Sequence, residues 1–150
     1  MKEALRKWAK GGKCREKFSK ILASKLKNSD VYEPAKNIML FYPLENEVNL
    51  LSLLEDTTKN FYLPKIEGKN LLCCPYSKGC ELCLSCFKTQ EPKTLPVDKN
   101  MIDLVVVPAL CCDKNNYRLG YGGGFYDRFL KDYTGKKVVC LPQELIVETI

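Results

Sequence analysis

The strongest strand signal in the sequence is the run Ile102-Asp103-Leu104-Val105-Val106-Val107, which ends at Pro108. It is a nearly continuous apolar stretch rich in β-branched residues, the pattern of a strand that is buried on both faces of a sheet. We therefore expect this run to form a central strand of an α/β protein.

Helix and strand patterns alternate on both sides of this run. Apolar residues recur at helical spacing near the N-terminus, and short apolar runs that end at prolines follow them. The alternation predicts a single α/β domain, a three-layer α/β/α Rossmann-like fold with an open and largely parallel sheet. The expected helices span residues 2–8, 15–26, 48–54, 126–130 and 143–147, and the expected strands span 37–42, 61–63, 71–74, 102–107 and 137–141.

Composition narrows the possible chemistry. The 150 residues include 24 Lys and Arg against 18 Asp and Glu, and the resulting charge of +6 favours anionic partners such as nucleotides, polyglutamated cofactors or nucleic acid. Histidine is absent, which excludes Ser-His and Cys-His catalysis and histidine metal ligands. The charged start and the lack of a long apolar run predict a cytoplasmic protein without a membrane segment.

Nine cysteines are present, and we expect them to be reduced thiols. Cys80, Cys83 and Cys86 lie within residues 77–99, a stretch without clear periodicity that is expected to be a long loop. Their spacing can begin an iron–sulfur or zinc site, but no fourth ligand follows at the right distance, which leaves Cys73 and Cys74 as distant candidates. Small apolar side chains are the expected role, and a metal site is the alternative.

A glycine-rich segment, RLGYGGGFYDR at residues 118–128, follows the central strand and precedes a helical pattern. Glycines permit positive φ and close backbone approach, and free N–H groups at a helix start attract anions. Arg118 suits a phosphate and Asp127 suits Mg²⁺. The segment is neither a Walker A loop nor a dinucleotide fingerprint, in which a third glycine would replace Phe125. From these residues alone, a phosphate-binding loop and a flexible turn remain equally open.

Longer runs resemble the 5-formyltetrahydrofolate cyclo-ligase family. The matching residues run from the central strand through the glycine-rich segment. A match of this length is specific. Lys2-x-x-Leu5-Arg6 resembles the family's ATP-contacting motif. Further matching residues are Asp103 to Leu110, Asp113-Lys114, Tyr42-Pro43, Glu47-Val48-Asn49, Leu63-Pro64-Lys65 and Glu91-Pro92.

The resemblance implies an ATP- and Mg²⁺-dependent enzyme that converts 5-formyltetrahydrofolate into 5,10-methenyltetrahydrofolate and releases ADP and phosphate. It implies catalytic roles for Arg118 and Tyr126, a magnesium ligand in Asp127, and folate contacts from Tyr42 and Glu47. The implied ATP contacts are Lys2, Glu3, Ala4, Leu5, Arg6, Arg118, Leu119, Gly120, Tyr121, Gly122, Gly123, Gly124, Phe125 and Tyr126. Tyr121, Gly122, Gly123, Gly124 and Phe125 are also implied to contact the folate.

Simpler readings compete with these roles. Lys2 and Arg6 fit a solvated helix face, and Asp127 fits a helix start that favours negative charge. For the whole chain, the alternative is a non-catalytic nucleotide- or RNA-binding module. The basic residues are spread along the chain rather than clustered with stacking aromatics, so we do not expect the chain to bind nucleic acid. We expect it to be a monomer.

The C-terminal region departs from the family pattern. Family members continue beyond the segment equivalent to Gln143 to Val147 with a further strand, which carries another implied acidic metal ligand. We therefore expect residues 1–150 to form a single cyclo-ligase-like domain that lacks this strand, binds MgATP and turns over slowly.

Overall fold

The structure, a computed structural model, describes residues 2–10, 15–45, 47–85 and 89–150. Its main sheet has the strand order β3-β2-β1-β6-β9. β1 pairs in parallel with β2 and β6, β6 pairs in parallel with β9, and β3 runs antiparallel to β2. The predicted open and largely parallel sheet is thereby confirmed. Its strands are β1 (Asn37–Met39), β2 (Asn60–Glu67), β3 (Asn70–Tyr76), β6 (Leu104–Val106) and β9 (Lys136–Val138).

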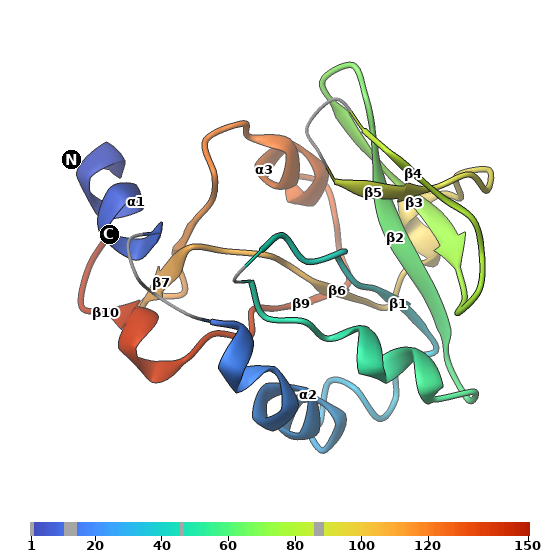
Figure 1. Cartoon of the computed structure of the whole chain (residues 1–150), viewed down its shortest axis with the longest axis horizontal. Helices are drawn as coiled ribbons and strands as arrows, with labels where there is room; N and C mark the ends of the chain where they lie inside the picture. Colours follow the sequence, from blue (N-terminus) through green and yellow to red (C-terminus); the bar gives the residue numbers. More distant parts are fainter. Residues whose placement is uncertain (1, 11–14, 46, 86–88) are drawn as a thin grey trace.

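Helices cover both faces of this sheet, which confirms the three layers (Figure 1). Successive strand residues point to opposite faces. Leu104 and Val106 therefore join one apolar cluster with α2 (Ser19–Lys27) and the 3₁₀ helix η2 (Leu51–Glu55). Val105 joins a second cluster with α3 (Phe125–Leu130).

The predicted central strand has the expected burial. Leu104, Val105 and Val106 are each 0% exposed, and full burial stabilises an aliphatic side chain by about 1.5–3 kcal/mol relative to exposure. β6 ends at Val106, two residues before Pro108. Because it is fully buried, it forms a rigid support for the chain that follows it.

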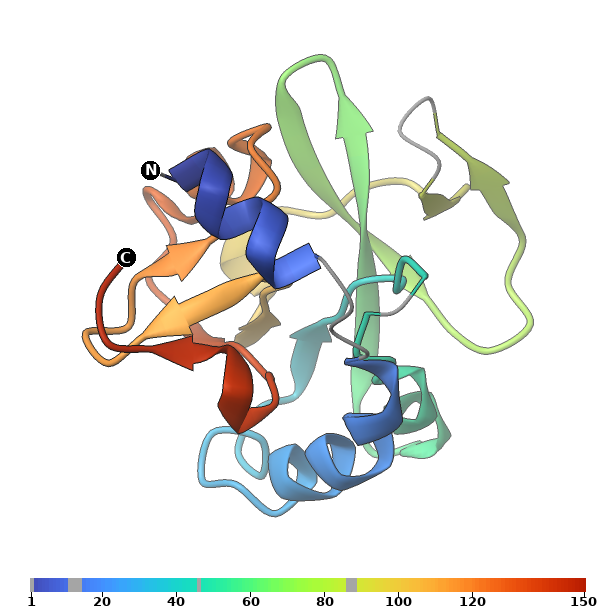
Figure 2. The same cartoon turned by 60° about the vertical axis from the view of Figure 1, so that its left-hand side comes forward.

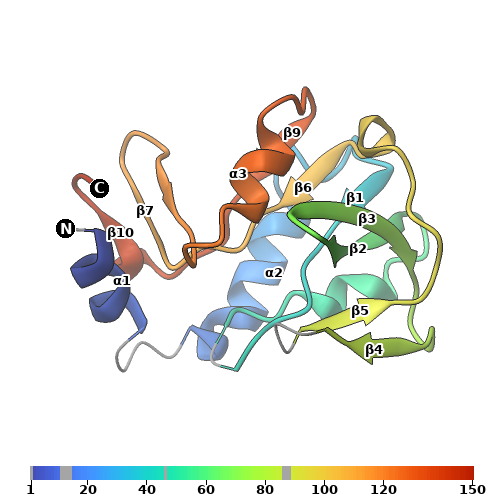
Figure 3. The same ribbon diagram turned by 90° about the horizontal axis from the view of Figure 1, so that it is seen from above.

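A smaller unit packs at one side of the main sheet. There β10 (Ile146–Val147), β7 (Cys111–Asp113) and β8 (Arg118–Leu119) form a second sheet in that order. α1 (Lys2–Lys10) lies beside this sheet, and both ends of the chain are close by (Figures 2 and 3). A third apolar cluster joins α1 to the sheet through Ala9, Leu110 and Leu119.

Several local predictions were wrong. Residues 77–99 are not all loop, since β4 (Leu82–Leu84) and β5 (Gln90–Pro92) form an antiparallel pair. The expected helix at 143–147 is a 3₁₀ turn, η4 (Gln143–Leu145), followed by the strand β10, which pairs with β7. The expected helix at 48–54 is the 3₁₀ helix η2. The remaining 3₁₀ helices are η1 (Glu16–Phe18) and η3 (Lys99–Met101).

Two strands also continue through the prolines that were expected to end them. Pro64 lies within β2 and Pro75 within β3. Proline is tolerated where its missing N–H has no ladder partner. β3 is an edge strand, and Pro64 lies beyond the three residues of β2 that pair with β1.

Within the described ranges, no helix is long and apolar enough to cross a membrane.

Candidate active site

A cavity of about 480 Å³ lies beyond the carboxyl ends of β1 and β6. Phe41 and Tyr42 line it just after β1, and Pro108 lines it just after β6. In open α/β sheets, ligands bind in the crevice outside the carboxyl ends of neighbouring strands. Among the predicted site residues, those that line the cavity are Arg6, Tyr42, Glu47, Arg118, Gly120, Tyr121, Gly122, Gly123, Gly124, Phe125, Tyr126 and Asp127.

A tight turn between β7 and β8 positions Arg118. The Asp113 carboxylate accepts hydrogen bonds from the backbone N–H groups of Asn115 and Tyr117, at 2.9 and 3.0 Å. Asn116 adopts a left-handed φ of 67°, a conformation that asparagine tolerates better than most residues. The returning strand then aligns Arg118 opposite Cys112, with its side chain at the cavity.

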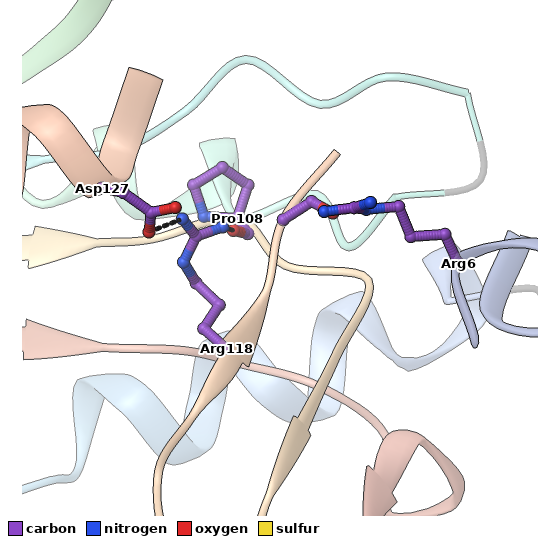
Figure 4. A network of polar contacts seen from close by, with 5 residues as sticks. Arg6, Pro108, Arg118 and Asp127 are labelled. Carbon is purple, nitrogen blue, oxygen red and sulfur yellow. Dashed lines mark hydrogen bonds and ion pairs between the residues drawn. The ribbon is translucent and has the colours of Figure 1, made fainter. Parts of the chain in front are cut away.

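The Arg118 guanidinium connects two sides of the cavity (Figure 4). It donates one hydrogen bond of 3.0 Å to the Pro108 carbonyl and another of 3.0 Å to the Asp127 carboxylate. The Arg118 side chain is only 13% exposed, whereas that of Asp127 is 77% exposed. A guanidinium carries more N–H donors than these two contacts use. Arg118 can therefore bind an anion in the cavity without leaving its present position.

Two glycines allow the backbone of the glycine-rich segment to pack against the Arg118 side chain and to turn into α3. Gly124 precedes α3 with a φ of 72°, a conformation in which a side chain would be strained. At Gly120, an added Cβ would lie 2.7 Å from the Arg118 guanidinium. The Arg118 side chain therefore packs directly on the backbone of the glycine-rich segment.

A buried carboxylate forms another part of the wall. Glu47 is 6% exposed, and its two oxygens accept hydrogen bonds from the Leu44 N–H (2.7 Å) and the Tyr121 hydroxyl (2.8 Å). Burial raises the pKa of Glu47, although these hydrogen bonds and the charge of Arg15 act in the opposite direction. The pKa of Tyr121 is raised by burial and by the neighbouring carboxylate. The pair is a fixed acceptor site that is largely shielded from water.

Tyr126 contributes a hydroxyl without a protein partner. Its oxygen is buried and makes no hydrogen bond within the described part of the chain, and burial raises the pKa of the phenol. An unsatisfied buried polar group costs about 1–3 kcal/mol. Because Tyr126 lines the cavity, a bound ligand with a polar group is the natural partner for this hydroxyl.

Arg6 brings α1 to the site. Its Nε donates a 3.0 Å hydrogen bond to the Gly120 carbonyl, and it approaches from the side opposite to Asp127 (Figure 4). The other predicted N-terminal contacts do not line the cavity: Lys2, Glu3 and Ala4 are exposed, and Leu5 packs against the third apolar cluster. Leu119 is buried in that same cluster. The structure thus brings Arg6 to the cavity but not its predicted neighbours.

Sequence reasoning missed several lining residues. An apolar wall comes from β2 and β3, through Pro64, Ile66 and Leu71. One edge comes from the start of β5 and the residue before it, through Thr89, Gln90 and Glu91. Pro64 and Glu91 belong to the segments that resemble the family, but no local pattern places any of these residues at a cavity. The position of Pro108, directly after the strongest strand, was the one local signal that indicated a site.

The carboxylates present fit a weakly held divalent cation. Asp127 is exposed at the cavity, and no group of three or more Cys, Asp or Glu side chains in the described ranges is arranged to hold a metal ion. Mg²⁺ commonly binds through one or two carboxylates together with water and substrate phosphates. Asp127 therefore fits a magnesium ion that arrives with a phosphate ligand.

The predicted cysteine cluster is only partly described. Cys80 lies 3.1 Å from the Ser77 hydroxyl, and this hydrogen bond lowers the pKa of Cys80. Cys83 lies in β4, and Cys86 falls outside the described residues.

Comparison with known sequences identifies one family. The chain matches the 5-formyltetrahydrofolate cyclo-ligase family over residues 1–148. It is 33% identical over 116 residues to the 5-formyltetrahydrofolate cyclo-ligase of Haemophilus influenzae, covering 70% of this chain and 61% of that protein. The Escherichia coli enzyme of the same name is 32% identical over 110 residues, covering 66% of this chain and 59% of that protein. The chain thus spans less than two thirds of the length of these relatives.

Comparison with solved structures extends the match to the fold. The NMR structure of Aquifex aeolicus 5,10-methenyltetrahydrofolate synthetase superposes with a TM-score of 0.86 at 30% identity, covering 99% of this chain and 81% of that one. A 5,10-methenyltetrahydrofolate synthetase from Mycoplasma pneumoniae superposes with a TM-score of 0.69 at 25% identity, covering 89% and 79%. Because the family model matches residues 1–148 and the fold matches over 99% of the chain, the chain belongs to the 5-formyltetrahydrofolate cyclo-ligase family.

Proposed function

We propose that this chain uses ATP to convert 5-formyltetrahydrofolate into 5,10-methenyltetrahydrofolate. The observation that supports this most strongly is a single cavity with two chemically different sides. On one side, Arg118 and the glycines beside it suit phosphate, and on the other, the Glu47 carboxylate suits a ligand with N–H donors. A cavity of about 480 Å³ falls within the range of small-molecule sites.

The phosphates of ATP would lie along the glycine-rich segment. Arg118 would contact their oxygens through its remaining donors, and charge-assisted hydrogen bonds of this kind are the stronger ones. Arg6 holds the carbonyl of Gly120, so α1 fixes the position of the segment. These contacts support an ATP site built from α1, β8 and the start of α3.

The reduced pterin of the folate would face Glu47 and Tyr42. A pterin ring presents amino and amide N–H groups, and an ionised carboxylate accepts such hydrogen bonds with its remaining lone pairs. The ring would pack against Phe41 and against the apolar wall formed by Pro64, Ile66 and Leu71. This arrangement would bring the formyl group toward the phosphates.

The chemistry requires mainly positioning and charge stabilisation, so the absence of histidine is no obstacle. The formyl oxygen on N5 attacks the γ-phosphorus, the bond to the β-phosphate oxygen breaks, and ADP leaves. N10 then attacks the activated carbon, loses its proton and displaces phosphate, which closes the methenyl ring. Arg118 would stabilise the charge on the transferred phosphoryl group, and the Tyr126 hydroxyl would hydrogen-bond to an oxygen of the reacting groups.

Asp127 would hold the magnesium ion that accompanies ATP. When bound, this ion would neutralise phosphate charge during the transfer. We also propose that residues 1–150 form a single domain. Cytoplasmic location and a monomeric state remain predictions from the sequence.

The decisive experiment follows the absorbance of the methenyl product after the protein is mixed with 5-formyltetrahydrofolate and MgATP. We expect one ADP and one phosphate released for each ring closed. Samples without ATP, or with a non-hydrolysable ATP analogue, serve as controls and should form no product. ATP binding without folate-dependent turnover would instead support a nucleotide-binding module.

A further inference from the structure

Arg15 is an unusual residue in the fold because it is a buried arginine. It precedes η1 and is 5% exposed, although arginine is rarely buried unless it is paired. One of its terminal nitrogens donates a 3.0 Å hydrogen bond to the Ala9 carbonyl near the end of α1. Its Nε is buried and has no hydrogen-bond partner in the described part of the chain. The contact with Ala9 alone therefore does not account for a buried charge.

Arg15 lies near the Glu47–Tyr121 pair, close enough for its side chain to interact with the Tyr121 hydroxyl and for its charge to act on Glu47. It lowers the pKa of Glu47 and of Tyr121, against the effect of burial on both. Both of these side chains line the cavity, whereas Arg15 does not. Arg15 would therefore act on a ligand in the cavity through these two residues rather than by touching it.

The other groups around Glu47 do not supply a compensating charge. The Leu44 N–H and the Tyr121 hydroxyl that bond to its oxygens are neutral donors. The Glu47 charge also raises the pKa of Tyr126, another neutral phenol. Among the interactions that set the pKa of Glu47, Arg15 is the charged one.

We propose that Arg15 is a positioning residue that holds the buried Glu47–Tyr121 pair in place for the folate, while its bond to Ala9 connects this pair to the helix that carries Arg6. The substrate part of this inference rests on the proposed function. Without the guanidinium, Glu47 would be a buried carboxylate with neutral partners, and it would take up a proton or shift out of position. Either change removes an acceptor from the cavity.

Three variants test this role. Arg15→Gln removes the charge but keeps an N–H donor for the Ala9 carbonyl, and Arg15→Lys keeps the charge. Lys20→Met is the matched control, because Lys20 is an exposed cation on the neighbouring helix α2. We expect Arg15→Gln to bind 5-formyltetrahydrofolate about tenfold more weakly, as for one charge-assisted contact. Arg15→Lys should lose less than Arg15→Gln, and Lys20→Met should match the unmodified protein.

A double-mutant cycle separates positioning from a general structural effect. If Arg15 acts through the charge of Glu47, the loss caused by Arg15→Gln should largely disappear when Glu47→Gln is already present. Independent, additive losses would overturn the proposal. If Arg15→Gln alone does not fold, the combined variant should regain folding because no uncompensated charge remains, and failure of both to fold would also overturn it.

A second readout does not depend on folate chemistry. Carboxyl NMR of ¹³C-labelled glutamate, with Glu47→Gln used to identify the Glu47 signal, follows the ionisation of Glu47 in the free protein. Its midpoint should move to higher pH in Arg15→Gln and stay close to the original value in Arg15→Lys. An unmoved midpoint in Arg15→Gln would refute the role of Arg15. Failure of the unmodified protein to bind the folate, with the midpoint shift present, would instead refute the proposed function.

Discussion

Replacing Arg118 with methionine should weaken the reaction with ATP without unfolding the protein. The guanidinium is 13% exposed at the cavity wall, where a charge-assisted hydrogen bond contributes about 1.5–3 kcal/mol. Loss of one such contact to phosphate corresponds to about a ten- to hundredfold decrease in kcat/KM for MgATP. Of the two partners that lose a donor, Asp127 is 77% exposed and Pro108 lines the cavity. Water can therefore solvate the carboxylate and reach the carbonyl, and the fold should lose little stability.

The turn between β7 and β8, which also positions Arg118, offers a matched control for this measurement. Lys114 forms a 2.6 Å ion pair with Glu148, but both side chains are mostly exposed, at 64% and 81%. Exposed pairs of this kind contribute about 0–1 kcal/mol, so Lys114→Met should leave the kinetics unchanged. Arg118→Lys should be intermediate, because lysine keeps the charge but loses the fork of donors.

The assay is the appearance of the methenyl product over a range of MgATP concentrations, with thermal unfolding measured on the same samples. A folded Arg118→Met protein with the kcat/KM of the unmodified chain would remove Arg118 from the site. Equal losses in Arg118→Met and Lys114→Met would show that the hairpin, rather than the guanidinium, causes the effect.

Three further predictions follow from the site. Asp127→Asn should raise the magnesium concentration needed for half-maximal rate, because the ion loses an anionic oxygen ligand; an unchanged magnesium titration would contradict that role. Burial raises the pKa of Glu47 above 4.5, so the folded state binds more protons than the unfolded chain just above this pH. The free energy of unfolding of the natural chain should therefore fall relative to Glu47→Gln as the pH rises above 4.5. A difference in urea-unfolding free energy that does not depend on pH would refute this. Replacing Cys80, Cys83 and Cys86 with serine should leave activity and metal content unchanged, and loss of stoichiometric zinc or iron in that variant would reveal a metal site.

Parts of the fold were predictable because their signals are local. The apolar run at β6 and the periodic positions of α2 each identify an element from neighbouring residues alone. Arg118 and Asp127 were each identified from the glycine-rich segment that separates them, whereas the 3.0 Å ion pair between them was not predicted.

The distant members of the site came from a different source. Arg6, Tyr42 and Glu47 are isolated residues of common types, and no local pattern indicates that they share a cavity. Their prediction rested on the family resemblance. The tertiary structure brings Tyr121 within 2.8 Å of Glu47 across 74 positions of sequence, a proximity that neither segment encodes by itself.

By itself, the sequence determined the elements whose stability depends on neighbouring residues: a buried central strand, amphipathic helices and a glycine-rich turn with an arginine at its start. Only the tertiary structure decided the rest. Prolines could remain in β2 and β3 because β3 is an edge strand and Pro64 lies beyond the residues of β2 that pair with β1. Residues 82–84 became a strand because 90–92 pair with them. Arg15 became a buried charge for the same kind of reason. Its stabilising partners, Ala9 and the Glu47–Tyr121 pair, reach it through the packing of α1 and of two distant loops, and the free energy of such contacts depends on positions in space rather than on spacing along the chain.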